Sequence, residues 1–248
     1  MLGMQDALVK LSISILISIK RRFMPNGLIQ EKDKNKCNTE RKVALLGDSI
    51  FDNESYVLPG EAVIDQVNLL DKVGWSAELL AVDGAVTKDV SSQCERVTED
   101  MTHIVVSIGG NNALGYISVF EKNISSVYEG MQVLAAIKDQ FQKSYQEMLK
   151  EVVSLDMNLV LCTIYNTCPG VEIPLLTALS VFNDVIFHEA FKLGVPVLDF
   201  RQTFNNPSDY SSVSPIEPSE AGGVKIAKVL QNLMELHDFS TKRSVVYH

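Results

Sequence analysis

The stretch Lys42–Asn53, KVALLGDSIFDN, begins as a continuous apolar run and ends in small and polar residues. Short apolar runs that stop at a turn are typical of strands buried on both faces of a parallel sheet. Gly47, Asp48 and Ser49 follow this run directly. We therefore expect Ser49 at the carboxyl end of a central strand, beside a turn or helix N-terminus whose backbone N–H groups can stabilise negative charge.

From this strand onward, short apolar runs alternate with longer amphipathic segments, a pattern that predicts a parallel sheet with crossover helices. Strands are expected at residues 42–47, 77–82, 103–108, 158–164 and 195–199, and helices near 60–72, 86–97, 126–154, 173–193 and 219–236. The pattern predicts an α/β protein, a three-layer α/β/α sandwich with a five-stranded parallel sheet. The apolar stripe of the long helix, from Met131 through Leu134 and Ile137 to Leu149, is interpreted as core rather than as a lipid groove.

Composition limits the class of function. The chain has 248 residues, 46% of them hydrophobic and 21% charged, which suits one globular domain with a sizeable core. Its net charge is -9, and no face rich in Lys and Arg is expected in the folded part. A nucleic-acid partner is therefore not expected, because phosphate backbones are bound by clustered positive charge. A small-molecule substrate fits better.

The domain is expected to span residues 41–238, between an N-terminal extension, 1–40, and a C-terminal tail, 239–248. The extension carries an apolar stretch at 11–19, followed by the basic residues Lys20–Arg22. This stretch is too short to span a bilayer. It remains open whether it is an interfacial anchor facing anionic lipid, a disordered leader, or the result of a start codon placed too far upstream.

The four cysteines show no pattern that suggests metal binding or a disulfide framework. They are Cys37, Cys94, Cys162 and Cys168, with no CxxC spacing among them. Cysteines used in this way are typical of a reducing compartment, so a cytoplasmic protein is expected.

Ligands in open α/β sheets bind outside the carboxyl ends of the strands, so the loops that follow the strands are the candidate site. The second such loop contains Gly84, which can bring a bare backbone N–H close to a ligand. The third contains Asn111, whose side-chain amide is a donor. Together with the N–H of Ser49, these groups could form an oxyanion hole with three donors.

Three segments, LLGDSIFDN, VDGAVT and VSIGGNNALG, resemble in order the first three sequence blocks of the SGNH (GDSL-type) esterases and lipases. The resemblance covers residues 42 to 236 and implies the flavodoxin-like SGNH hydrolase fold. It also implies Ser49 as nucleophile, Gly84 and Asn111 as oxyanion-hole donors, and no metal or organic cofactor. One departure is Asn112, where the third block usually has Asp. That carboxylate is expected to order the loop rather than to take part in the chemistry.

The fourth block departs further. The family pattern is Asp-x-x-His followed by Pro and a Gly-bearing helix, whereas this chain reads SPIEPSEAGG, with Ser214 and Glu217 at the acid and imidazole positions. Glu217 is therefore the general base by position, and burial in an apolar pocket would raise its pKa toward neutrality. The alternative is that Glu217 only caps the last helix.

Other ionisable residues are weaker candidates. Asp199 ends the fifth strand and either orients the site or pairs with Arg201. The histidines lie at strand or helix ends away from the expected site or at the chain terminus, and are interpreted as structural or solvated: His103, His188, His237 and His248.

The leading hypothesis from sequence is a serine ester hydrolase acting on a small or medium acyl ester. Two alternatives stay open. A degenerate domain would bind an ester, acyl chain or sugar without turnover, and an acyltransferase would pass the acyl group to an acceptor other than water.

Overall fold

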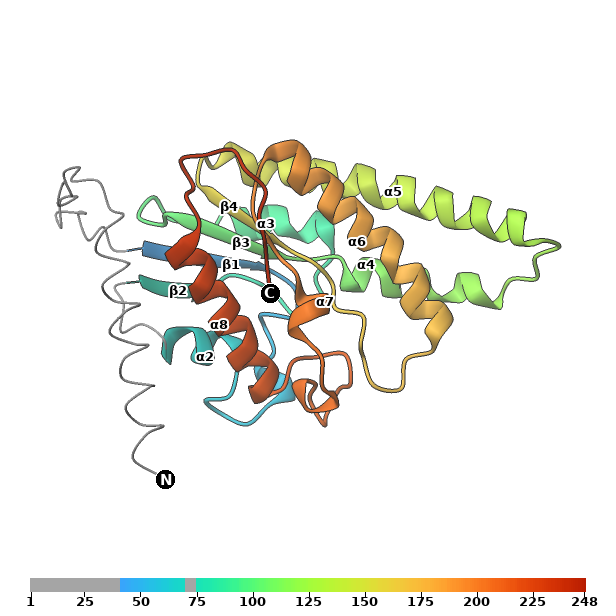
Figure 1. Ribbon diagram of the computed structural model, residues 1–248, viewed down its shortest axis with the longest axis horizontal. Helices are drawn as coiled ribbons and strands as arrows, with labels where there is room; N and C mark the ends of the chain where they lie inside the picture. Colours follow the sequence, from blue (N-terminus) through green and yellow to red (C-terminus); the bar gives the residue numbers. More distant parts are fainter. Residues whose placement is uncertain (1–40, 70–74) are drawn as a thin grey trace, which may run out of the picture. The chain divides into compact units, whose positions relative to one another are not determined.

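A computed structural model describes residues 41–69 and 75–248; the predictions for residues 1–40 lie outside this part of the chain. Its centre is a parallel sheet with strand order β2-β1-β3-β4-β5-β6 (Figure 1). The strands are β1 (Arg41–Gly47), β2 (Trp75–Leu79), β3 (His103–Ser107), β4 (Asn158–Cys162), β5 (Val197–Leu198) and β6 (Val246–Tyr247).

Helices connect the strands. They are α2 (Val63–Leu69), α3 (Val90–Cys94), α4 (Gly110–Leu114), α5 (Val127–Ser154), α6 (Ile173–Leu193), α7 (Phe200–Thr203) and α8 (Glu220–Leu236). Short 3-10 turns lie at η1 (Glu54–Tyr56), η3 (Thr87–Asp89), η4 (Ile117–Glu121) and η5 (Pro207–Asp209). Serine side chains cap two of the helices: Ser126 accepts from the N–H of Glu129, and Ser219 from the N–H of Gly222. No helix within residues 41–69 and 75–248 is long and apolar enough to cross a bilayer.

The sheet separates two hydrophobic cores, because successive side chains of a strand point to opposite faces. In β1, Ala44 and Leu46 face the core that includes residues of α3, α5 and α6. Val43 and Leu45 face the core shared with α2 and α8. Figure 1 shows α2 and α8 beside one face of the sheet and α3, α5 and α6 toward the other. The predicted three-layer α/β/α sandwich is confirmed.

The sheet differs from the prediction at its edges. β2 begins two residues before the predicted strand, and β5 is reduced to Val197–Leu198. A sixth strand is added by Val246–Tyr247, which pairs with β5 in parallel, so the predicted five-stranded sheet is one strand short. These two residues lie in the segment expected to be a tail. The apolar run here is only three residues long, 245–247, which is too short to predict a strand without its partner in the sheet.

The first strand meets the third at the point where the strand order reverses, which is where α/β sheets form their ligand crevice. Gly47 ends β1 with φ +132, and a Cβ at this position would lie 1.7 Å from the carbonyl oxygen of Ser107. Only glycine allows this approach. The N–H of Asp48 then donates to that same oxygen at 3.1 Å, so the loop that carries Ser49 starts against the end of β3.

Candidate active site

Ser49 lies in a tight turn at the carboxyl end of β1 and is 6% exposed. The carbonyl oxygen of Asp48 accepts from the N–H groups of Phe51 and Asp52, each at 3.1 Å, which closes the turn around Ser49. The buried side chain of Gln93 fixes the start of the turn, since it accepts from the N–H of Gly47 at 2.7 Å and donates to its carbonyl at 2.8 Å. The sequence analysis missed Gln93, which lies in an ordinary helical pattern far along the chain.

Asn111 and Asn112 hold the third loop against the second. The amide of Asn111 donates to the carbonyl of Ala85 at 3.0 Å, which leaves its second N–H for another acceptor. Asn112 accepts from the N–H of Thr87 at 3.1 Å and donates to the Thr87 hydroxyl at 3.2 Å. An amide therefore orders this loop at the position where the resemblance leads one to expect a carboxylate.

Gly84 adopts a left-handed conformation with φ +77 directly after the β2 loop. It is exposed and lies outside the lining of the cavity that contains Ser49, Asn111 and Glu217. Its neighbour Ala85 carries the carbonyl that Asn111 binds. The structure thus brings three of the four principal predicted residues to one cavity and Gly84 to the loop beside it.

Glu217 is positioned by contacts from two distant segments. Asn53, four residues after Ser49, is fully buried and donates to the carbonyl of Pro218 at 3.0 Å. The hydroxyl of Tyr165, in the loop after β4, donates to the carbonyl of Ile216. Backbone groups on both sides of Glu217 are therefore held. Its side chain is 5% exposed and lines the same cavity as Ser49.

The surroundings of Glu217 change its acidity. Burial raises the pKa of the carboxyl group to about 7; a side-chain hydrogen bond with Ser49 lowers the pKa, and the charge of Asp83 raises it. The Oε2 atom is buried and accepts no hydrogen bond within the described residues. A carboxylate with a pKa near the operating pH, in contact with a hydroxyl, is suited to accept its proton.

Asp48 is a second buried carboxyl group in this cavity, 2% exposed. Burial raises its pKa to about 7, a hydrogen bond from the N–H of Ile50 lowers it, and the charge of Glu217 raises it. Two such groups disfavour each other's ionisation, so their titrations belong to the pair. Sequence reasoning missed this interaction because Asp48 and Glu217 meet only in the folded chain.

The secondary candidates lie outside the cavity lining. The carbonyl of Ser214 accepts from the N–H of Glu217 at 3.2 Å, which makes Ser214 part of the turn that leads to it. Asp199 binds the guanidinium of Arg201 through both carboxylate oxygens, each at 2.7 Å, and accepts from the Thr163 hydroxyl at 2.8 Å. Burial raises the pKa of Asp199, but these hydrogen bonds outweigh it and hold the pKa below its ordinary value. The carboxylate of Asp199 is thus engaged in an ion pair.

All four histidines lie outside the cavity lining. The ring of His103 contacts the side chains of Thr102 and Asn158, and burial together with the charge of Arg41 lowers its pKa to about 4. The side chain of His188 is 62% exposed, and His237 contacts the Tyr247 hydroxyl at 3.2 Å. No histidine is thus positioned to accept a proton from Ser49.

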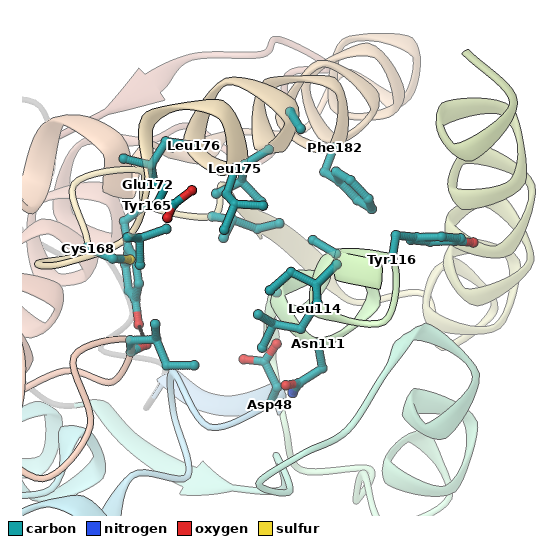
Figure 2. Close-up of a pocket in the computed structure, with 18 of the residues that line it drawn as sticks. Asp48, Asn111, Leu114, Tyr116, Tyr165, Cys168, Glu172, Leu175, Leu176 and Phe182 are labelled. Carbon is teal, nitrogen blue, oxygen red and sulfur yellow. Dashed lines mark hydrogen bonds between the residues drawn. The ribbon is translucent and has the colours of Figure 1, made fainter. Parts of the chain in front are cut away.

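The cavity itself has a volume of about 380 Å³ and opens between the helices that follow β3 and β4 (Figure 2). Its polar and ionisable lining residues are Asp48, Ser49, Asn111, Glu217, Tyr116, Tyr165, Cys168 and Glu172. Its walls are apolar and include Leu114, Ile117, Leu134, Leu176, Leu179 and Phe182. In Figure 2, Asp48 and Asn111 lie together below Leu114, with Leu175, Leu176 and Phe182 across the cavity. Such a cavity is suited to an apolar group attached to a polar reacting centre.

This arrangement corrects the interpretation of the α5 stripe as core. Phe141, Tyr145 and Leu149 are buried core residues. Ile137 is buried in the same core and also lines the cavity, whereas Leu134 lines the cavity and Met131 is 55% exposed. Helical periodicity marks the face that avoids water, but it does not distinguish a face covered by side chains from one that borders a cavity.

Metal chemistry has no donor set here: within residues 41–69 and 75–248, no three His, Cys, Asp or Glu side chains gather closely enough to hold an ion. Cys94, Cys162 and Cys168 are free thiols. Cys168 lines the cavity, where burial raises its pKa to about 11, so it remains protonated near neutral pH.

The sequence matches no family profile and no curated protein. Solved structures are similar. The lipase Lip_vut3 from a goat rumen metagenome has a TM-score of 0.62 at 19% identity, over 77% of this chain and 96% of the lipase. The chain has the SGNH hydrolase fold. A member of the lipolytic G-D-S-L family from Veillonella parvula (TM-score 0.56, 14% identity) covers 79% of this chain and 97% of its own. The acetyl xylan esterase AlAXEase (TM-score 0.59, 16% identity) covers 77% and 98%.

At these identities the likeness is one of fold. The SGNH hydrolase fold accounts for the shared placement of the loops after β1, β2 and β3 at one edge of the sheet. The roles of individual side chains at that edge depend on this chain's own geometry.

Proposed function

We propose that this protein is a serine ester hydrolase of the SGNH type that acts on a small or medium acyl ester, with Ser49 as nucleophile and Glu217 as general base. One observation carries the proposal. A buried hydroxyl interacts with a carboxyl group whose pKa is about 7, in a cavity whose walls are mostly apolar. A nucleophile beside a base is the arrangement that acyl transfer requires.

In the acylation step, the Ser49 oxygen attacks the ester carbonyl while Glu217 takes the hydroxyl proton. The carbonyl oxygen becomes an oxyanion, which receives hydrogen bonds from the free N–H of the Asn111 amide and from the backbone N–H of Ser49, the two predicted donors that line the cavity. The intermediate then collapses. The bond from the carbonyl carbon to the alcohol oxygen breaks, and that oxygen takes the proton from Glu217 as the alcohol leaves.

Deacylation reverses these roles with water in place of the alcohol. Glu217 takes a proton from the water as the water oxygen attacks the acyl carbon, and it returns that proton to Ser49 when the acid leaves.

The apolar walls support an ester whose acyl chain occupies the cavity. Each methylene removed from water contributes about 0.8 kcal/mol, so the cavity favours a chain longer than acetyl. The names of similar structures include both lipases and acetyl xylan esterases, a range that spans long and short acyl groups. The walls of this cavity favour the longer part of that range.

The test is labelling of the purified protein with a fluorophosphonate probe, followed by mass mapping and assays with a series of nitrophenyl esters. We expect stoichiometric labelling at Ser49 and ester hydrolysis, both lost in Ser49→Ala. Circular dichroism of Ser49→Ala shows whether the variant is folded. Absence of both labelling and turnover in a folded wild-type protein would favour a domain that binds without reaction.

Acyl transfer is separated from hydrolysis by the products. The free acid is expected as the main product in water, and a transferred ester should form only when a large excess of a competing alcohol is added. A transferred product that predominates at low alcohol concentration would contradict hydrolysis as the main reaction.

A further inference from the structure

An exposed apolar surface borders the cavity. We call it the apolar rim and define it by Leu114, Ile117 and Phe120 on one side and by Val127, Tyr128 and Ile173 beyond them. Leu114, Ile117 and Phe120 line the cavity and are also 44%, 47% and 50% exposed. Glu172 is also exposed and part of the lining, so the cavity opens to solvent between these apolar side chains and one carboxylate.

The outer residues of the apolar rim are more exposed. Val127 is 78%, Tyr128 73% and Ile173 78% exposed. They begin α5 and α6, whose first turns, together with η4, lie at the same end of the domain in Figure 1. Apolar side chains gathered in this way around a binding cavity mark an interaction site more often than single exposed apolar residues do.

The charges near the apolar rim indicate the kind of surface that it can meet. Lys122 is the basic residue between Leu114 and Met131, where Glu121 and Glu129 are acidic, and Glu172 precedes Ile173. Glu129 accepts hydrogen bonds from the backbone and hydroxyl of Ser125 and so caps the start of α5. Anionic membranes are bound by clustered Lys and Arg. The acidic excess here disfavours anionic lipid, whereas the exposed apolar side chains can contact lipid of no net charge.

We propose that the apolar rim docks on an uncharged or zwitterionic lipid surface and that the substrate's acyl chain passes directly from this lipid phase into the cavity. This inference rests on the proposed ester hydrolase function and names the physical state of its substrate: an ester embedded in a lipid aggregate. Docking removes the exposed apolar side chains from water, which favours the bound state.

The position of the apolar rim favours lipid over a protein partner. Leu114, Ile117 and Phe120 form part of the cavity wall, so a protein seated on the rim would cover the opening above Ser49. A fluid lipid surface covers the same side chains and leaves the opening in contact with acyl chains. A second copy of this chain is the competing occupant, and the experiment distinguishes it.

The experiment is flotation of the full-length protein with phosphatidylcholine vesicles in physiological salt. The variant replaces Val127, Tyr128 and Ile173 together by Ser, because these side chains are exposed and lie outside the cavity lining. The control replaces Phe191 and Leu236 by Ser; they are 55% and 73% exposed and lie near the C-terminal ends of α6 and α8.

We expect the wild-type protein and the control to float with the vesicles and the rim variant to lose at least about tenfold in partitioning. Hydrolysis of a soluble short-chain ester should be the same in all three proteins, which also shows that they are folded. Hydrolysis of a long-chain ester within the vesicles should fall in the rim variant alone.

Three results would overturn the proposal. The rim variant floats as well as the wild type, or the wild type floats only with anionic vesicles, or sedimentation shows a wild-type dimer that the rim variant lacks. Flotation is also measured with the Ser49→Ala variant, so that docking is tested in a protein that cannot turn over the ester. Failure of docking with intact short-ester hydrolysis therefore contradicts the rim alone, whereas loss of hydrolysis with intact flotation contradicts the proposed function alone.

Discussion

At Glu217, burial and a neighbouring hydroxyl act in opposite directions on the pKa of one carboxyl group, and burial is the larger effect. The resulting value of about 7 lies close to the ordinary pKa of imidazole, about 6.5. A buried carboxylate can therefore serve as a proton acceptor in the pH range where histidine usually does. An exposed glutamate at the same position would have its ordinary pKa, which is roughly two units below that of histidine, and would be a correspondingly weaker base.

This pKa predicts the pH dependence of the reaction. Glu217 accepts a proton only when ionised, so kcat/KM should rise with pH and reach half of its plateau near pH 7. Glu217→Gln should reduce kcat by about 100-fold or more. Glu217→His, which restores a base, should be faster than Glu217→Gln. A rate that is constant between pH 5 and 8 would contradict Glu217 as the base.

Asp48→Asn provides a matched test of the interaction between the two carboxyl groups. The Asn side chain can still accept from the N–H of Ile50, which Asp48 binds at 3.2 Å. It carries no charge, so ionisation of Glu217 becomes easier, and the rising part of the pH profile should move to lower pH. An unchanged profile in an active Asp48→Asn variant would show that the two groups titrate independently.

At the scale of elements, the site depends on hydrogen bonds between loops that come from distant parts of the chain. Asn53 connects the segment after β1 with both the Glu217 loop and α2, since it also accepts from the N–H of Val63 at 2.8 Å. Gln93 and Asn111 likewise bind neighbouring loops. Asn53 and Gln93 each pair both polar atoms of the amide with backbone groups, which makes the relative position of the loops specific.

Asn53→Ala tests this connection. The change leaves the carbonyl of Pro218 and the N–H of Val63 without their partner, and buried groups left unpaired cost about 1–3 kcal/mol each. We expect a lower midpoint in urea unfolding and a fall in kcat that exceeds the change in KM, because Glu217 is no longer held beside Ser49. Asn123→Ala, at an exposed position, is the control and should leave both quantities unchanged. A loss of stability with normal kcat would show that Asn53 does not position the base.

At the scale of the whole domain, the two helical layers differ in how they pack near the site. α2 and α8 pack closely together. On the other side, α4, α5 and α6 enclose the cavity and supply most of its apolar wall. The acyl specificity of the protein should therefore depend on the α4–α6 side.

Chain length measures this dependence. kcat/KM should rise by about fourfold for each added methylene, the equivalent of about 0.8 kcal/mol, until the cavity is filled. Leu179→Trp reduces the volume of the cavity and should abolish the gain with long chains while acetyl ester hydrolysis persists. Phe191→Trp, outside the lining, should retain the full dependence. Equal chain-length profiles for the wild type and Leu179→Trp would contradict occupation of this cavity by the acyl chain.

The sequence by itself determined the layers of the fold and the identity of the central loops. Apolar runs such as Val43–Leu46 are buried on both faces, and the helical period of 173–193 coincides with α6, because both signals follow directly from which side chains avoid water. The positions of Ser49 and Asn111 at one edge followed from the direction of parallel strands, and that of Glu217 followed from the resemblance of its segment to the fourth family block.

Only the tertiary structure decided the properties that depend on contacts between residues distant in sequence. The raised pKa values of Glu217 and Asp48 come from burial by segments far apart in the chain, and the hydrogen bond from Asn53 to Pro218 joins residues that are also far apart in the sequence. The sixth strand exists only beside β5. Part of the α5 stripe borders a cavity that residues of α4 and α6 also line, which no periodicity encodes. Periodicity reports the average environment of a face, whereas acidity and cavity shape depend on the particular atoms that meet there.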